Sequence, residues 1–90
     1  MGSDPNIFPC SVYILYSAEL NKYYVGQTEN LEERLISHQK GISRFTSSAK
    51  DWQLVYVERF STRTEAIRRE REIKAKKSRN YIEWLIKLSG

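Results

Sequence analysis

The chain has 90 residues, of which 40% are hydrophobic and 29% charged, and its formal net charge is +4. This length allows one small globular domain with a modest core and excludes two. No apolar run approaches the ~18 residues that a membrane-spanning helix needs. The single cysteine, Cys10, excludes an internal disulfide and a paired-cysteine zinc site. The positive charge favours a polyanionic partner.

The first nine residues, MGSDPNIFP, lack the basic start and the apolar stretch of a secretory signal. We therefore expect residues 1–9 to be a disordered arm or a remnant of an expression tag, and residues 10–90 to form a single domain. A lone cysteine and no signal suit a reducing cytoplasm, which is the expected location.

Two short segments near the start predict an antiparallel hairpin. Residues 11–17 (SVYILYS) and 23–27 (YYVGQ) are rich in β-branched and aromatic types, and the connector between them is short and polar. A helix follows the hairpin. Asn30 is a good N-cap with Glu33 three residues on, and Gly41 suits the position just after the helix end.

After a polar loop over residues 42–51, residues 52–60 (WQLVYVERF) read as a third strand. Thr62 and Glu65 form a capping-box pattern that predicts a long helix to about Lys76. Ser78 can cap a last helix, whose apolar residues should dock on the core: Ile82, Leu85 and Ile86. The order ββαβαα predicts an α+β domain, a small three-stranded antiparallel sheet flanked by helices.

The first helix places polar residues on its apolar stripe. Leu31, Arg34, Leu35 and His38 follow the i, i+3, i+4, i+7 spacing of a single face. An arginine and the only histidine of the chain are thus expected where the core should be.

The long helix has the same feature. With Ala66 set to zero at ~100° per residue, Glu70 falls near 40° and Ile73 near −20°, so Glu70 lies within the apolar arc. A carboxylate there is costly unless it is paired, hydrogen-bonded or bound to a metal. Two interpretations stay open: a buried Arg34–Glu70 ion pair with His38 as a core histidine, or a cleft in which Arg34 holds a phosphate and Glu70 holds Mg²⁺.

Residues 63–79 concentrate the positive charge, with eight basic residues against three acidic ones. A solvated helix with i,i+4 pairs such as Glu65–Arg69 and Glu72–Lys76 explains this run. A surface for a polyanion is the alternative, and the run taken alone favours the solvated helix.

The motifs of the predicted hairpin help to decide between a buried Arg34–Glu70 ion pair and a cleft that binds phosphate and metal. "SVY" at residues 11–13 and "YVG" at 24–26 resemble the paired signature of the GIY-YIG nuclease superfamily. "ENLEERLISH" resembles its arginine-bearing helix, and "EAIRREREIK" its glutamate-bearing helix. The resemblance extends from Ser11 to about Ile86. It is strongest to the small standalone bacterial members, which are related to the N-terminal nuclease domain of the bacterial excinuclease.

The resemblance implies roles for five residues. Tyr13 and Tyr24 would stand near the scissile phosphate, with Tyr13 favoured as general base and Tyr24 as its support. Arg34 would neutralise the phosphate, and His38 would hydrogen-bond the phosphate or a tyrosine. Glu70 would be the only protein ligand of one Mg²⁺ or Mn²⁺ ion. Burial and packing alone explain the remaining tyrosines, and Trp52 and Trp84 are expected in the core.

Some positions depart from the family pattern or extend it. Ser11 replaces the first glycine of the signature, and Gln27 stands where several family nucleases carry a lysine. Asn80 is the candidate for a late asparagine of the site. In the loop "SRFTSSAK", Arg44 and Lys50 are types that contact phosphate, although an ordinary hydrophilic loop explains them as well.

The expected activity is that of a metal-dependent endonuclease acting on DNA rather than RNA, selective for structure rather than sequence, in repair or recombination. A separate protein partner could supply specificity. The alternative is a nucleic-acid-binding module that keeps the nuclease fold but has little activity of its own and works through a partner. A role in protein interaction alone needs neither the charge nor the polar stripes.

Overall fold

A computed structural model describes residues 8–39 and 49–89 of the chain. Its three strands form one antiparallel sheet in the order β2-β1-β3. The strands are β1 (Cys10–Ser17), β2 (Lys22–Thr28) and β3 (Gln53–Phe60). The helices are α1 (Leu31–Gln39), α2 (Arg63–Lys76) and α3 (Arg79–Ser89). The predicted α+β class and the order ββαβαα are confirmed.

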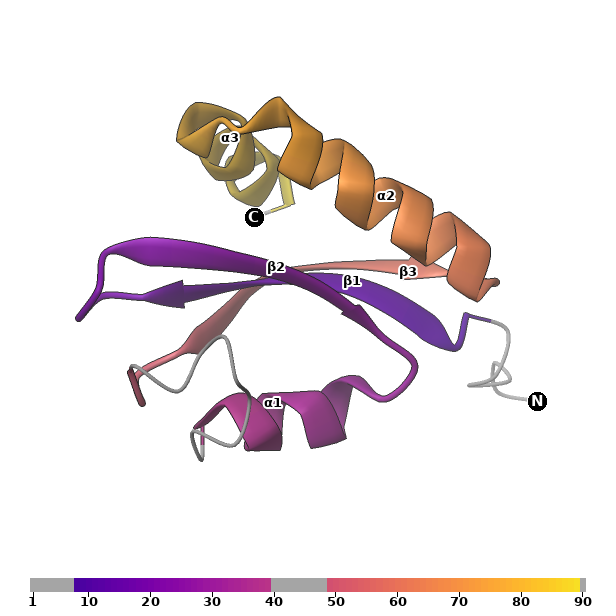
Figure 1. The fold of residues 1–90 in the computed structure, drawn as a ribbon, viewed down its shortest axis with the longest axis horizontal. Coiled ribbons are helices and arrows are strands. Elements are labelled where there is room, and N and C mark those ends of the chain that lie inside the picture. Colours follow the sequence, from indigo (N-terminus) through magenta and orange to yellow (C-terminus); the bar gives the residue numbers. More distant parts are fainter. Residues whose placement is uncertain (1–7, 40–48, 90) are drawn as a thin grey trace.

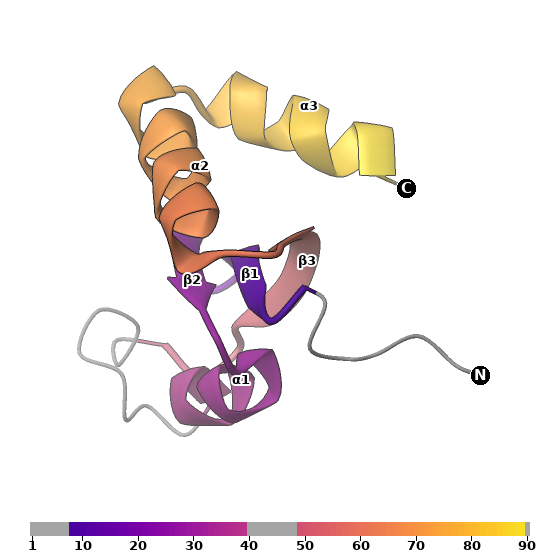
Figure 2. The same cartoon turned by 90° about the vertical axis from the view of Figure 1, so that its right-hand side faces the viewer.

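The sheet separates two layers of helix. Helix α1 lies against one face, and α2 and α3 lie on the other (Figures 1 and 2). The side chains of the central strand alternate accordingly. Tyr13 and Leu15 belong to the cluster on the α1 side, whereas Val12 and Ile14 belong to the cluster under α2 and α3. Strand β1 is therefore buried along almost its whole length, since both of its faces are covered.

The predicted helix starts are confirmed by their caps. The Asn30 side chain accepts a hydrogen bond from the Glu33 backbone N–H at 3.1 Å, and Thr62 accepts one from the Glu65 N–H at 3.2 Å. Ser78 caps α3 by accepting from the Tyr81 N–H at 3.1 Å. These side chains satisfy N–H groups that have no partner within their helices. The predicted end of the first helix at Gly41 lies outside the described residues.

The hairpin register brings a tyrosine over a glycine. Tyr13 of β1 is paired with Gly26 of β2. A Cβ atom on Gly26 would lie 2.6 Å from the Tyr13 hydroxyl oxygen and 2.7 Å from Cζ. Only glycine leaves room for the phenol to lie across the neighbouring strand. The "YVG" motif thus has a structural reason in the position of Tyr13.

One core prediction is confirmed and one is wrong. Trp52 is 5% exposed and packs with the α1-side cluster, as predicted. Trp84 is 53% exposed, because Leu85 takes the buried position on α3 and Trp84 stacks from outside on Tyr81, with the ring centres 5.8 Å apart. Of the helices in residues 8–39 and 49–89, none combines the length and apolar character needed to cross a membrane.

Candidate active site

A buried hydrogen bond joins β1 to α1. The Tyr13 hydroxyl oxygen and His38 Nε2 are 2.9 Å apart, and each residue is only 1% exposed. Helix α1 brings His38 to the sheet because Leu31 and Leu35, on the same stripe, pack into the cluster around Tyr13. The structure therefore assigns His38 a tyrosine partner, one of the two contacts that the family resemblance implied for it.

Tyr24 completes an aromatic group around this bond. Its ring centre lies 6.2 Å from that of Tyr13 and 5.1 Å from that of His38, in tilted arrangements. Tyr24 is half-buried, in contrast to Tyr13. Both signature tyrosines and the histidine thus meet at one place, and Tyr24 is the member that retains access to solvent.

Burial is the main influence on the Tyr13 phenol and raises its pKa above the ordinary value of 10.0. Tyr24 and Glu70 raise this pKa further, and Arg34 lowers it. Burial outweighs the lowering effect of Arg34 on this pKa, so Tyr13 is a neutral phenol at pH 7. Both charged candidates also act on this one hydroxyl, which places Arg34 and Glu70 within electrostatic reach of it.

The pKa of His38 is lowered from 6.5, first by burial and then by the positive charge of Arg34. The imidazole is therefore neutral at pH 7. A neutral ring has one nitrogen with a lone pair, so Nε2 can accept the hydrogen bond that Tyr13 donates. In the tautomer that carries its proton on Nδ1, Nε2 accepts from the Tyr13 hydroxyl, whose oxygen lies 2.9 Å away.

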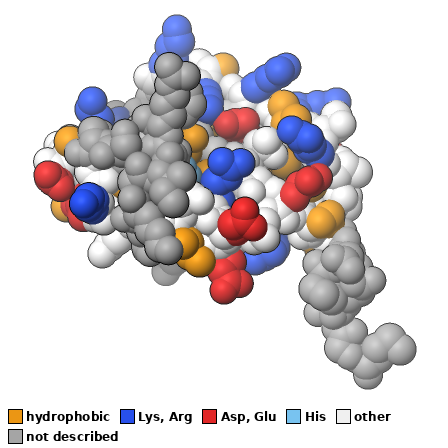
Figure 3. All heavy atoms as spheres, turned by 60° about the horizontal axis from the view of Figure 1, so that its bottom comes forward, with side chains coloured by type: hydrophobic (Ala, Val, Ile, Leu, Met, Phe, Trp, Pro, Cys, Tyr) orange, Lys and Arg blue, Asp and Glu red, His pale blue; other side chains and the backbone are white. Residues whose placement is uncertain are grey.

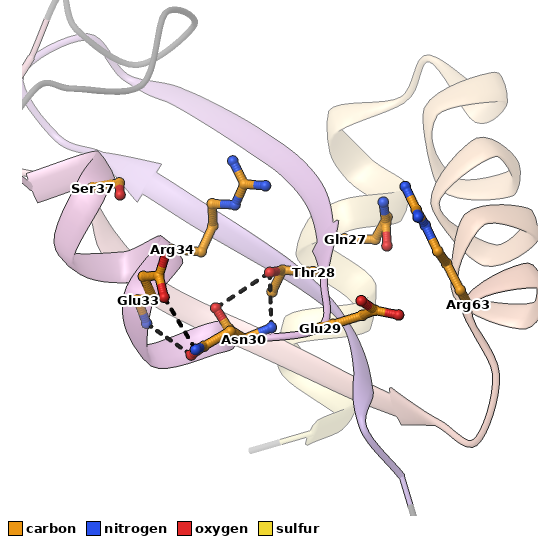
Figure 4. A pocket seen from close by; sticks show the side chains of 8 residues that line it. All are labelled: Gln27, Thr28, Glu29, Asn30, Glu33, Arg34, Ser37 and Arg63. Carbon is orange, nitrogen blue, oxygen red and sulfur yellow. Dashed lines mark hydrogen bonds between the residues drawn. The ribbon is translucent and has the colours of Figure 1, made fainter. Parts of the chain in front are cut away.

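Arg34 does not share the burial of its stripe. It is exposed, whereas Leu31 and Leu35 on the same stripe are half-buried, which excludes the alternative of an Arg34 buried in an ion pair. It lines a pocket of about 380 Å³ between the start of α1, the end of β2 and the start of α2. Figure 4 shows the guanidinium on the side of α1 that faces Gln27 and Arg63.

Gln27 lines the same pocket, and its side-chain oxygen has no hydrogen-bond partner among the described residues. Its Oε1 is buried and, among the described residues, is the one buried side-chain polar atom without a hydrogen-bond partner. An unpaired buried polar atom is costly. Gln27 is thus a polar residue of this pocket whose side-chain oxygen no other described residue satisfies.

Glu70 is paired with its own helix. Its Oε2 lies 2.8 Å from Lys74 Nζ, and its side chain is 19% exposed. No ion pair joins it to Arg34 within the described part of the chain, so the buried Arg34–Glu70 pair is not the explanation of these two residues. The half-buried position of Glu70 agrees with its predicted place on the apolar arc.

The residues present fit a single Mg²⁺-type ion. Residues 8–39 and 49–89 contain no group of three or more His, Cys, Asp or Glu side chains that could hold a metal by themselves. Mg²⁺ does not need one, because it is usually bound through one or two carboxylates and keeps several waters, with substrate phosphates completing its shell. Glu70 is the carboxylate whose charge acts on Tyr13.

Three further residues were predicted to contact nucleic acid, namely Arg44, Lys50 and Asn80. Arg44 lies outside the described residues. Lys50 is exposed, next to the buried Ala49 that packs beside Tyr13. Asn80 is exposed in the first turn of α3, on the opposite side of the sheet from α1 (Figure 1).

Sequence reasoning missed Arg63 as a member of the site. It begins α2 and lines the pocket of Arg34 and Gln27. Its position within the basic run 63–79 was the only signal for it in the sequence. The face of the molecule shown in Figure 3 carries basic and acidic side chains side by side, so charge alone does not mark this site.

Comparisons with known proteins identify the family of the chain. Residues 9–82 match the model of the family described as GIY-YIG catalytic domain. A UPF0213 protein of Staphylococcus haemolyticus is 42% identical over 64 residues, which cover 70% of this chain and 77% of that protein. A UPF0213 protein of Natronomonas pharaonis is 38% identical over 65 residues, covering 71% and 75%.

A solved structure supports the same assignment. The solution NMR structure of a UPF0213 protein from Bacillus halodurans matches with a TM-score of 0.58 at 32% sequence identity. The match covers 90% of this chain and 85% of that one. The signature strands, the helix with Arg34 and the helix with Glu70 all fall within the matched family region.

Proposed function

The chain belongs to the GIY-YIG family of catalytic domains, which implies a nuclease, and on this basis we propose a metal-dependent endonuclease that hydrolyses phosphodiester bonds in DNA. The observation that carries the proposal is the Tyr13–His38 hydrogen bond beneath Gly26, with Arg34 and Glu70 both acting on the Tyr13 hydroxyl. A phenol with a proton acceptor, a cation and a carboxylate are the parts that phosphodiester hydrolysis needs.

In the proposed reaction a water oxygen attacks phosphorus and the bond to the leaving 3′ oxygen breaks. The water proton passes to the Tyr13 oxygen as the Tyr13 proton passes to His38 Nε2. This relay suits a phenol whose pKa is raised by burial, since it needs no resting phenolate. Tyr24, beside both partners, supports the pair by orienting the water.

Arg34 binds the phosphate through its planar fork of donors and stabilises the added negative charge. Glu70 would hold one Mg²⁺ or Mn²⁺ ion, which supplies charge neutralisation at the phosphate and at the leaving oxygen when bound. Gln27, with its unpaired Oε1, and Lys50 would contact the nucleic acid around the scissile bond. We assign no direct role to Asn80.

The test compares plasmid, nicked and flapped DNA with RNA as substrates, in Mg²⁺, in Mn²⁺ and in EDTA. The proposal expects metal-dependent cutting of DNA, strongest on branched forms, that is lost in Arg34→Ala and Glu70→Ala. Arg71→Ala and Glu72→Ala are matched controls on the exposed side of α2 and should cut like the wild type. A purified wild-type protein that cuts no form of DNA in either metal contradicts the proposal.

The second candidate is a nucleic-acid-binding module with the nuclease fold and little activity. Gln27 in place of a lysine favours it, because one cation of the transition state is then absent. It expects salt-sensitive DNA binding that is indifferent to metal and to Glu70→Ala. Either function suits a cytoplasmic protein that acts in repair or recombination, with a partner protein supplying specificity.

A further inference from the structure

A second hollow lies on the other side of the β2 edge from α1, between β2, the end of α2 and the start of α3. It measures about 600 Å³. Its floor is apolar and includes Val25, Ile73 and Ile82. Its rim is positive: four of the described lining residues are basic and none is acidic, namely Lys22, Lys74, Lys77 and Arg79. We name it the β2 groove.

Two of the four basic side chains at the rim form no ion pair with another described residue. Lys74 is bound to Glu70, and Arg79 is bound to Glu83 at 3.1 Å. Lys22 and Lys77 are exposed and have no ion pair within residues 8–39 and 49–89. Their positive charge is therefore available to a ligand at the rim.

Backbone conformation points to the same groove. In the described chain, the non-glycine residues with positive φ are Asn21 (φ 53°) and Lys77 (φ 48°), and both line the groove. Asparagine tolerates this conformation, but a lysine at a helix end occupies a position that normally favours glycine. A lysine held in an unfavourable conformation suggests that its side chain is kept for function rather than stability.

The groove and the pocket of Arg34 are lined by successive stretches of the same strand and the turn after it. Residues 21–25 of the hairpin line the groove, and residues 27–30 line the pocket of Arg34. Gly26 lies between them, directly over the Tyr13 hydroxyl. Tyr24 belongs to both places, since it lines the groove and its ring lies against His38.

We propose that one strand of nucleic acid runs along the β2 edge, with its backbone phosphates on Lys22 and Lys77 and its scissile phosphate over Gly26. The occupant is a polyanion because the rim is wholly basic, and a single strand because the apolar floor accepts sugars and bases between the phosphates. This inference rests on the proposed function for the position of the scissile phosphate.

The test measures binding of a fluorescein-labelled single-stranded DNA by anisotropy over a range of salt concentrations, in EDTA so that no cleavage occurs. Lys22→Gln/Lys77→Gln should bind several-fold more weakly. Its slope of log affinity against log salt should fall by about 0.7 for each phosphate that the variant no longer neutralises. Arg71→Gln/Lys87→Gln removes the same charge outside the groove and should keep the wild-type slope.

A second variant separates binding from folding. Lys77→Gly removes the charge and relieves the positive-φ conformation, so it should raise the melting temperature while it weakens binding. Loss of binding in this variant cannot then come from unfolding.

The outcomes also separate this inference from the proposed function. If the wild type cuts DNA but the groove variants bind and cut as it does, the groove assignment is overturned and the nuclease stands. If the wild type binds through the groove but cuts nothing, the nuclease is overturned and the groove stands. Equal losses of affinity in the groove and control variants would also overturn the assignment, because net charge alone would explain them.

Discussion

Two tyrosines, one on each face of the sheet, show how differently the two layers use polar groups. Tyr13 on the α1 side is buried and bonds to the neutral His38. Tyr56 on the α2 side is half-buried and donates to the Glu58 carboxylate, which in turn binds Arg69 at 3.2 Å. Burial raises the pKa in both cases, that of Tyr56 to about 12 with the help of Glu58.

The difference lies in what surrounds each phenol. Arg69 joins Glu58, Glu72 and Tyr81, so the charges around Tyr56 are mutually satisfied. Around Tyr13, Arg34 and Glu70 act on the hydroxyl without pairing with each other, and the unpaired Oε1 of Gln27 lies in the adjoining pocket. A closed network stabilises a fold, whereas an exposed Arg34 with no ion pair among the described residues and an unpaired Gln27 oxygen beside a buried phenol are typical of a site that binds something else.

The largest expected effect is a loss of cleavage in Tyr13→Phe that Tyr56→Phe does not show. Tyr13→Phe removes the proposed proton relay, so cleavage should fall by about 10²–10⁴-fold. Tyr24→Phe should lose less, because His38 still accepts from Tyr13. Tyr56→Phe is the matched control, since it also removes a partly buried hydroxyl and its hydrogen bond, and it should cut at the wild-type rate. The measurement is single-turnover cleavage of a flapped DNA, and equal losses in Tyr13→Phe and Tyr56→Phe would remove the distinction between the two faces.

Glu70→Ala separates function from stability. Cleavage should fall by about 10²–10³-fold, the range found when a group that stabilises transition-state charge is removed. Stability should change little, because the Glu70–Lys74 pair is an i,i+4 pair worth about 0.3–0.5 kcal/mol, and alanine favours the helix. We expect the variant to melt at or above the wild-type temperature.

Differential scanning calorimetry in EDTA and in Mg²⁺ measures this effect, with Glu72→Ala as the control on the same helix. A destabilisation of about 3–5 kcal/mol in EDTA would instead indicate that Glu70 is half of a buried ion pair.

Gly26→Ala should disturb the packing of Tyr13 on the α1 side of the sheet, without adding or removing a polar group. The new methyl would lie 2.6 Å from the Tyr13 hydroxyl oxygen, and a phenol that is 1% exposed has little room to move. Overpacking of this kind costs about 1–3 kcal/mol, so urea unfolding should shift to lower concentration. Cleavage by the folded fraction should also fall, because Tyr13 and His38 are pushed apart. A variant with wild-type stability and activity would show that Tyr13 has another position available.

The smallest effect is a pH dependence that belongs to the α1 side alone. The pKa of His38 is lowered in the folded protein, so below pH ~6.5 the unfolded chain binds a proton that the folded chain does not. Stability is therefore complete above pH ~6.5 and falls as the pH drops toward the folded-state pKa. Urea unfolding from about pH 8 to 5.5 should show this fall in the wild type and a weaker one in His38→Gln. The same pH dependence in both proteins would place the titrating group elsewhere.

The elements, their order and their caps could be predicted from the sequence, because these features depend on local patterns. Alternating β-branched and aromatic residues specify the strands, and Asn30, Thr62 and Ser78 satisfy the N–H groups that start each helix. The helical spacing also identified His38 and Glu70 as polar residues on apolar faces. Helical spacing gives a direction around the axis but not a depth, so it could not show that Arg34 is exposed while His38 on the same stripe is buried.

Which of these residues meet depends instead on the packed chain. The Tyr13–His38 bond joins residues 25 positions apart, and its geometry depends on the hairpin register that sets Tyr13 over Gly26. The Glu70–Lys74 pair is a local i,i+4 contact, but whether Glu70 also meets Arg34 depends on where α1 and α2 pack on the sheet. The β2 groove exists because three elements, β2, α2 and α3, converge on one edge. Distances across elements follow from packing, and packing is a property of the whole chain that no short stretch of sequence contains.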